Sequence, residues 1–157
     1  KKNVRVLTGW LARMSHHAPD VIVSCSQAAM VRHGELGFDR YRMKIINNGT
    51  DMRLFRPVPE ASDELREELG IPMGAPVVGI AGRWTPEKDY PTFFKAALAL
   101  EERMPDVHFL VCGKGLDSSN KEALRFVNRA KNPSQFHLLG IRSDMPRIYT
   151  TLSLIHI

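Results

Sequence analysis

Residues 76–82 read Pro-Val-Val-Gly-Ile-Ala-Gly, an apolar run that ends in glycine and has no alternating polar positions. Two similar apolar runs follow at residues 107–112 and 136–139. Segments with helical periodicity separate the three runs. Strands that are apolar on both faces and alternate with helices are typical of βαβ units, whose strands form a parallel sheet. The sequence therefore predicts an α/β fold, with a parallel sheet that carries helices on both faces.

Capping signals predict where the helices between these strands begin. Ser62 fits the N-cap of the first helix, and Asp89 fits the start of the second. Ser119 and Glu122 have the spacing of a capping box for the third. A short fourth helix is expected at residues 145–150.

The first third of the chain has elements of its own. Apolar residues recur at helical spacing between residues 7 and 14. Short apolar runs at 21–25 and 43–46 are expected to be strands, the first of them buried. Ser26 fits the N-cap of a helix between them, and Gly37 fits its end.

A domain boundary is expected near residue 51. Residues 47–51 read Asn-Asn-Gly-Thr-Asp, which is typical of a turn, and Pro57 and Pro59 make the following stretch irregular. We therefore divide the chain into residues 1–51 and 52–157. The first residue is not Met, and residues 152–157 read as a strand with nothing after it, so we expect a piece of a longer protein. Alternatively, the last few residues are not native sequence.

Composition excludes several classes of protein. The 157 residues are 43% hydrophobic and 25% charged, as in an ordinary globular protein and unlike a disordered tail. No apolar run reaches the roughly 18 residues of a membrane span. Two cysteines, Cys25 and Cys112, are too few for a disulfide scaffold, and we expect both to be buried free thiols. His16 and His17 are adjacent, which does not suit a pair of metal ligands.

The net charge of +5 is unevenly distributed. Residues 1–59 contain ten Lys and Arg against four Asp and Glu. A basic first third is compatible with a membrane surface, nucleic acid, an anionic substrate or simply a solvated surface. The basic residues are scattered, which argues against nucleic acid.

Three loops follow the three apolar runs, and each begins with glycine and carries a cation. The carboxyl ends of parallel strands lie at one edge of a sheet, where ligands bind in such folds. Cations that converge there suit a polyanion such as a nucleoside diphosphate. The glycines are Gly82, Gly113 with Gly115, and Gly140, and the cations are Arg83, Lys88, Lys114 and Arg142.

Two common nucleotide motifs are absent from the sequence. Ser118 occupies the third glycine position of G-x-G-x-x-G, and there is no G-x-x-x-x-G-K-[ST] loop. A nicotinamide enzyme and a P-loop ATPase are therefore not indicated.

Together, the loops resemble a known family. Residues 82–89 are similar to the G-R-x-x-x-x-K motif of glycosyltransferase family 4. Residues 112–115 and 137–140 resemble that family's next two strand-end glycines. Upstream, residues 21–26 and 46–51 resemble its "D-x-V-x-x-x-S" and "I-x-N-G-x-D" segments. The resemblance covers nearly the whole chain.

The resemblance implies the GT-B architecture, in which two Rossmann-like domains face each other and a sugar is transferred with retention of configuration. Residues 1–51 would be the C-terminal piece of the acceptor-side domain, and residues 52–157 the first half of the donor-binding domain. Arg83 and Lys88 would be catalytic, clamping the donor diphosphate without a metal ion. The remaining binding residues implied are Gly82, Gly113, Gly115, Gly140, Ile141 and Arg142, the last two through main-chain atoms that face the base.

The resemblance also implies partners and a location. The donor is a nucleotide-diphosphate sugar and no separate cofactor is expected. The acceptor is a glycan or a lipid-linked glycan, and the enzyme is cytoplasmic, at the inner face of a membrane with which it could associate peripherally. The family's pair of glutamates would follow Ile157, so we expect residues 1–157 alone to be inactive. The alternatives are a GT-B-related sugar-nucleotide epimerase and a non-catalytic basic module that binds anions, nucleic acid or a membrane surface.

Overall fold

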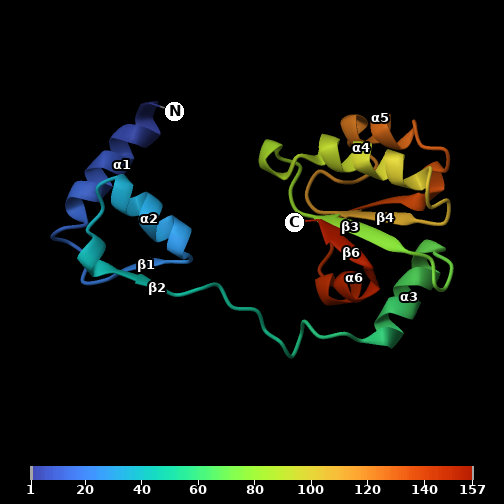
Figure 1. Cartoon of the computed structure of the whole chain (residues 1–157), viewed down its shortest axis with the longest axis horizontal. Coiled ribbons are helices and arrows are strands. Elements are labelled where there is room, and N and C mark those ends of the chain that lie inside the picture. Colours follow the sequence, from blue (N-terminus) through green and yellow to red (C-terminus); the bar gives the residue numbers. More distant parts are fainter. Residues whose placement is uncertain (1, 157) are drawn as a thin grey trace. The chain divides into compact units, whose positions relative to one another are not determined.

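A computed structural model describes residues 2–156 of the chain, and side chains from Val4 onward. The chain divides into two compact units, Lys1–Asp51 and Met52–Ile157 (Figure 1). The division coincides with the boundary expected from the sequence. Which substrate each unit binds stays a prediction.

The first unit is a small α/β segment. It contains α1 (Lys2–Met14), β1 (Ile22–Ser24), α2 (Gln27–Glu35), a 3₁₀ turn (Arg40–Arg42) and β2 (Met43–Ile45). The two strands are parallel. The Ser26 hydroxyl accepts a hydrogen bond from the Ala29 N–H at 3.1 Å, which confirms the predicted cap of α2. Gly37 follows that helix with a left-handed φ of 90°, as expected for its end.

Three expectations for the first unit are wrong. The strand at 21–25 is not buried, since Val21 and Val23 are 46% and 57% exposed. Cys25 is exposed as well, whereas Cys112 in the second unit is buried. The physical reason is that successive side chains of a strand point to opposite faces: Ser24 and Met43 are buried on one face of the short sheet, whereas Val23 points to the other face and is exposed. The expected turn at 47–51 is absent, since these residues form no turn, and the φ of Gly49 is not left-handed.

The second unit has the predicted parallel sheet with helices on both faces. Its helices are α3 (Pro59–Leu69), α4 (Tyr90–Glu101), α5 (Lys121–Val127) and α6 (Met145–Thr151), and its strands are β3 (Val77–Ala81), β4 (His108–Cys112), β5 (Phe136–Gly140) and β6 (Leu154–His156). The strand order is β5-β4-β3-β6 and every pairing is parallel. Helices α4 and α5 cover one face of the sheet and α3 and α6 the other (Figure 1). Residues 152–157 were expected to be a strand, and residues 154–156 are one, paired with β3.

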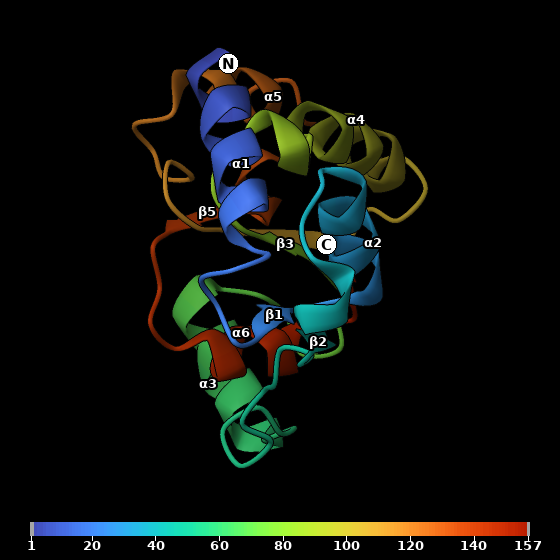
Figure 2. The same cartoon turned by 90° about the vertical axis from the view of Figure 1, so that its left-hand side faces the viewer.

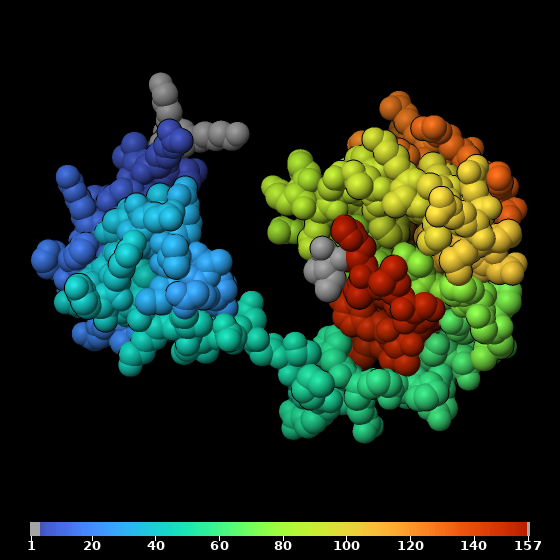
Figure 3. Space-filling view, viewed as in Figure 1, coloured from blue at the N-terminus to red at the C-terminus, as the bar shows by residue number. Residues whose placement is uncertain are grey.

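Each face of the sheet has its own core. Under α4 and α5, the rings of Phe109 and Phe136 stack with centroids 4.6 Å apart, and Phe94 is fully buried beside them. Under α3 and α6, which pack side by side, the buried residues include Leu65 and Ile148 (Figure 2). Figure 3 shows α6 and β6, in red, at the surface of this unit. Helices therefore cover the buried strands β3 and β4 on both faces of the sheet.

Two predicted helix starts are wrong, one by four residues and the other by one. Helix α3 begins at Pro59, not after Ser62, because proline at the first helical position has its φ already set for a helix. Helix α5 is capped by Asn120, whose side chain accepts from the N–H groups of Glu122 and Ala123. Ser119 instead donates to the Asp117 carboxylate.

Candidate functional site

The strand order indicates one edge of the second sheet as the candidate site. From β3 the chain first adds β4 and β5 on one side, and later adds β6 on the other. Open α/β sheets bind ligands outside the carboxyl ends of the strands at such a reversal. The three glycine loops leave this same edge.

Backbone hydrogen bonds link the three loops. The N–H of Gly82 donates to the Cys112 carbonyl at 2.9 Å, and the N–H of Gly113 donates to the Gly140 carbonyl at 2.7 Å. The N–H of Gly140 donates in turn to Leu116 at 2.7 Å. The structure therefore brings Gly82, Gly113 and Gly140 together, as expected from the sequence, while their contact with a ligand stays a prediction.

Gly113 is required by this packing. Its φ is 140°, and a Cβ atom built on it would lie only 1.7 Å from the Gly82 carbonyl oxygen. No side chain fits at that distance. The close approach of the first two loops thus depends on glycine at position 113.

The first loop folds Lys88 back over the end of β3. A 3₁₀ turn at Pro86–Lys88 is followed by Asp89, which has a left-handed φ of 45° and caps α4. The Lys88 methylene groups lie against Gly82, where a Cβ would meet Lys88 Cε at 3.2 Å. Arg83 is exposed directly after Gly82. Arg83 and the Lys88 side chain therefore both lie next to Gly82, at the edge of the sheet.

The carboxylate between these cations is satisfied locally. The N–H of Glu87 and the Thr85 hydroxyl both hold the pKa of the Glu87 carboxyl below its usual value, and Arg83 adds a smaller effect. Sequence reasoning required that Glu87 not repel an anion beside Arg83 and Lys88. Local hydrogen bonding is consistent with that requirement.

Trp84 is a structural residue of the site to which sequence reasoning gave no role. Its ring stacks on Tyr90 with centroids 5.1 Å apart, and its backbone N–H donates to the Lys114 carbonyl at 3.1 Å. Burial raises the pKa of Tyr90 to about 12. Trp84 thereby ties the first loop to both α4 and the second loop. The signal available was a large aromatic residue in a loop that is otherwise polar.

The second loop is held by its own polar groups. The Asn120 side chain donates to the Gly115 carbonyl while it caps α5. Asp117 accepts from Ser119, which lowers the pKa of its carboxyl, and its Cβ would lie 3.4 Å from a Cβ on Gly140. Lys114 is exposed. The second loop is therefore ordered without using the Lys114 charge.

Arg142 was expected as one of several converging cations, and in the structure its guanidinium is already paired with carboxylates. Its guanidinium donates twice to Asp144, at 2.8 and 2.7 Å, and once to Glu68 on α3, at 2.8 Å. The hydrogen bonds from Arg142 lower the pKa of Asp144 to about 2. Its positive charge is therefore neutralised within the protein. A main-chain role for Ile141 and Arg142 is a separate prediction and stands.

The buried thiol of Cys112 lies beneath the third loop. It donates to the Gly140 carbonyl at 3.4 Å. Burial raises the pKa of this thiol, and the backbone N–H of Arg142 opposes that shift. Main-chain atoms of residues 140 and 142 therefore both face the Cys112 sulfur.

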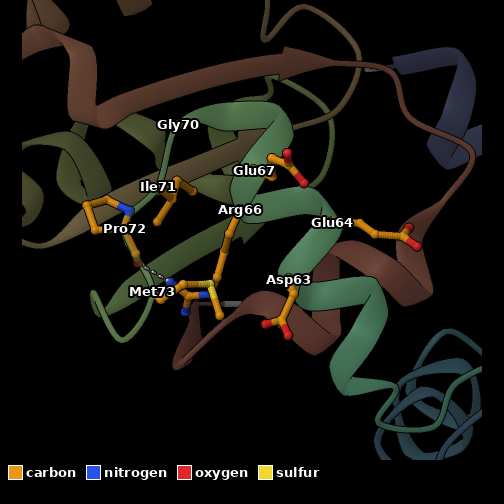
Figure 4. A pocket seen from close by; sticks show the side chains of 8 residues that line it. All are labelled: Asp63, Glu64, Arg66, Glu67, Gly70, Ile71, Pro72 and Met73. Carbon is orange, nitrogen blue, oxygen red and sulfur yellow. Dashed lines mark hydrogen bonds between the residues drawn. The ribbon is translucent and has the colours of Figure 1, made fainter.

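A surface hollow on α3 belongs to the opposite edge of the sheet (Figure 4). It lies where α3 turns into β3, and Arg66 donates there to the carbonyls of Pro72 and Ala75, both at 3.0 Å. These bonds fix the turn before β3. The hollow is separate from the three strand-end loops.

Within residues 2–156, no three His, Cys, Asp or Glu side chains are grouped so that they could hold a metal ion. His16 contacts the Gly37 carbonyl at 3.2 Å. In the same part of the chain, no helix is both long enough and apolar enough to cross a membrane.

Comparison with known proteins finds glycosyltransferases among the relatives of this chain. No family model matches the chain. The chain is 31% identical over 126 residues to the D-inositol 3-phosphate glycosyltransferase of Corynebacterium urealyticum, an alignment covering 69% of this chain and 30% of the relative. It is 25% identical over 158 residues to the UDP-Gal:alpha-D-GlcNAc-diphosphoundecaprenol alpha-1,3-galactosyltransferase of Escherichia coli, covering 94% of this chain and 39% of the relative.

Solved structures share the fold. The crystal structure of HepE from Anabaena in complex with UDP matches with a TM-score of 0.81 at 23% identity, covering 96% of this chain and 41% of that chain. The fold is therefore the Rossmann-like fold of GT-B glycosyltransferases. This chain spans 30% and 39% of the length of the two curated relatives. The resemblance to glycosyltransferases is thus confirmed, while membership of family 4 is untested.

Proposed function

We propose that this chain is part of a retaining glycosyltransferase of family 4, which moves a sugar from a nucleotide-diphosphate sugar to a glycan or lipid-linked acceptor. In this proposal residues 52–157 contribute to the donor site and residues 1–51 belong to the acceptor-side domain. The relatives named above are glycosyltransferases, so the epimerase and the non-catalytic basic module are not favoured.

One observation carries the proposal: Arg83 directly follows Gly82 and the Lys88 side chain packs against the same glycine, at the edge of the sheet where such folds bind ligands. Loss of a nucleoside diphosphate leaves negative charge on the β-phosphate. Fixed cationic donors stabilise such charge most when they are in place before it develops. The planar guanidinium of Arg83 suits two phosphate oxygens at once, and the ammonium of Lys88 supplies a point charge.

The fold supports this assignment of roles. Lys88 is held by its methylene groups against Gly82, so less side-chain freedom is lost when it binds an anion. The absence of side chains at Gly82, Gly113, Gly115 and Gly140 lets neighbouring protein groups pack closely at the strand ends, and in this proposal the backbone of these glycines contacts the ligand. In this proposal no metal ion and no separate cofactor takes part.

The third loop is proposed to meet the base. Ile141 and Arg142 follow Gly140, and the Arg142 side chain is turned away to Glu68 and Asp144. Main-chain groups therefore offer the polar contacts there. UDP is the first ligand to test, because the Escherichia coli relative is named for UDP-Gal and the HepE structure holds UDP.

The proposed acceptor and location follow from the same relative. Its name includes a diphosphoundecaprenol-linked sugar, which is a lipid-linked acceptor. We propose a similar glycan or lipid-linked acceptor here, and an enzyme in the cytoplasm at the inner face of a membrane, with peripheral association. Nucleic acid is not a proposed partner.

The test is sugar transfer by the full-length protein that contains this sequence. A panel of UDP-, GDP- and ADP-sugars is incubated with glycan and lipid-linked acceptors, and transfer from at least one donor is expected. Hydrolysis or epimerisation without transfer would contradict the proposal. Residues 1–157 alone are expected to transfer no sugar, since they span well under half of each relative.

A further inference from the structure

The loop after β5 is anchored at its start. Gly140 is buried with a left-handed φ of 63°, and both its N–H and its carbonyl bond to the neighbouring loop, through Leu116 and Gly113. Four residues then lead to α6. Ile141, the first of them, is 75% exposed although its side chain is apolar.

A second anchor comes from α3, a helix far away in the sequence. Arg142 binds Asp144 within its own loop through two parallel hydrogen bonds. Its remaining amino group donates to one oxygen of Glu68, 74 residues earlier, at 2.8 Å. The other Glu68 oxygen accepts from Arg147 on α6 at 2.7 Å. Glu68 thus joins both the loop and the following helix to α3.

These ion pairs are poorly placed to stabilise the fold. The side chains of Glu68 and Arg142 are 38% and 23% exposed, and pairs in contact with water contribute little to folding stability. Their geometric effect is larger, because a carboxylate with both oxygens engaged fixes two arginines relative to one helix. The network restricts where the loop can lie.

We infer that Glu68 is a positioning residue for nucleotide binding: by holding Arg142 it keeps the main chain of residues 141 and 142 in the conformation that receives the base of a nucleoside diphosphate. This inference rests on the proposed function. It adds a residue on α3 that touches no substrate and acts through Arg142. Preordering a loop lowers the entropy cost of binding without adding a contact to the ligand.

The experiment compares Glu68→Gln with Glu67→Gln in the full-length protein. Glu67 is the adjacent, exposed glutamate on the same helix and lies outside the network. Calorimetry measures binding of UDP, GDP and ADP to the unaltered protein, and then of the preferred nucleotide and inorganic pyrophosphate to each variant. Sugar transfer gives kcat and KM for the donor, and thermal melting reports folding.

For Glu68→Gln, the Kd of the nucleotide and the KM of the donor should rise by about three- to tenfold, the effect of one or two groups that must be ordered on binding. Pyrophosphate affinity, kcat and the melting temperature should be nearly unchanged. Glu67→Gln should match the unaltered protein. Arg142→Lys, which keeps the charge but loses the planar fork, should reproduce the nucleotide defect.

Equal weakening of nucleotide and pyrophosphate by Glu68→Gln would overturn the inference, since the loop would then act on the diphosphate or on the whole fold. Unchanged nucleotide affinity in both Glu68→Gln and Arg142→Lys would overturn it as well. In either case the proposed function survives if the unaltered protein binds a nucleotide and transfers sugar. If the unaltered protein binds none of the three nucleotides, the proposed function fails and the inference fails with it.

Discussion

The side chain of Lys88 lies across Gly82, so that a Cβ atom added to this glycine would come within 3.2 Å of Lys88 Cε. Arg83 begins at the next residue and is exposed. Arg83 and the side chain of Lys88 therefore both lie next to Gly82 at the end of β3, although four residues separate them in the sequence. The short 3₁₀ turn at Pro86–Lys88 brings the chain back to make this contact.

Removing either cation should impair catalysis. Hydrogen bonds to charged groups are worth roughly 1.5–3 kcal/mol, so Arg83→Ala or Lys88→Met should lower kcat/KM of the full-length enzyme at least about tenfold. Methionine keeps the apolar contact with Gly82 and removes only the charge. Steady-state kinetics check the prediction, with thermal melting as the control for folding. Near-normal kinetics in both variants would remove the diphosphate role.

Gly113 should tolerate no side chain. Gly113→Ala combines a left-handed φ with a contact to the Gly82 carbonyl that is far too short. We expect a loss of about 2–4 kcal/mol in the free energy of unfolding, measured by urea denaturation. Gly49→Ala is the control, because nothing lies within 4 Å of that position and its φ is not left-handed. Equal stability of the two variants would contradict the packing described for the loops.

The structure places Asn120 at the N-cap of α5, whereas the sequence predicted Ser119 there. Asn120→Ala should lower the free energy of unfolding by about 1 kcal/mol, since two N–H groups of the helix lose their acceptor. Ser119→Ala should change it by less than about 0.5 kcal/mol, as for an exposed surface residue. Denaturant titration of both variants measures the difference. A larger loss of unfolding free energy in Ser119→Ala than in Asn120→Ala would show that Ser119 caps the helix, as the sequence predicted.

A pair of histidines should make stability depend on pH. His108 Nδ1 lies 3.0 Å from His137 Nε2 and the rings stack. Burial, and then the neighbouring His108, lower the pKa of His137 to about 4. Burial and Arg66 also lower the pKa of His108, against an opposing effect of Asp106.

The direction of the effect follows from proton binding. Between about pH 6.5 and pH 4 the unfolded chain binds protons that the folded chain does not, so the free energy of unfolding should fall as the pH is lowered through this range. Urea denaturation at pH 7, 6 and 5 measures the slope. His137→Phe keeps an aromatic ring in the stack and should flatten the slope; an unchanged slope would show that other groups cause it.

Much of the second unit could be predicted from sequence because its signals are local. A strand buried on both faces is an apolar run whatever covers it, and Gly82, Gly113 and Gly140 follow such runs directly. The parallel topology then brings the glycines to one edge. That these three loops lie together at one edge of the sheet could therefore be predicted before the geometry was known.

The remaining features depend on contacts between distant parts of the chain. Arg142 pairs with Asp144 in its own loop, but its further contact with Glu68 depends on the packing of α3 against α6. The exposure of Val23 and Cys25 depends on which faces of the sheet are covered by other elements. An apolar run in the sequence does not show whether one face or both faces are covered. For the cap of α5, Ser119 and Asn120 are adjacent residues that both cap well, so propensity alone could not choose between them.

A crystal structure of the full-length protein with UDP, or with whichever nucleoside diphosphate it prefers, would show directly whether the strand-end loops bind the nucleoside diphosphate of the donor. We expect phosphate oxygens at hydrogen-bonding distance, about 3 Å, from both Arg83 and Lys88, and the base at the same distance from main-chain atoms of residues 141 and 142. A diphosphate bound away from Arg83 and Lys88 would contradict this expectation.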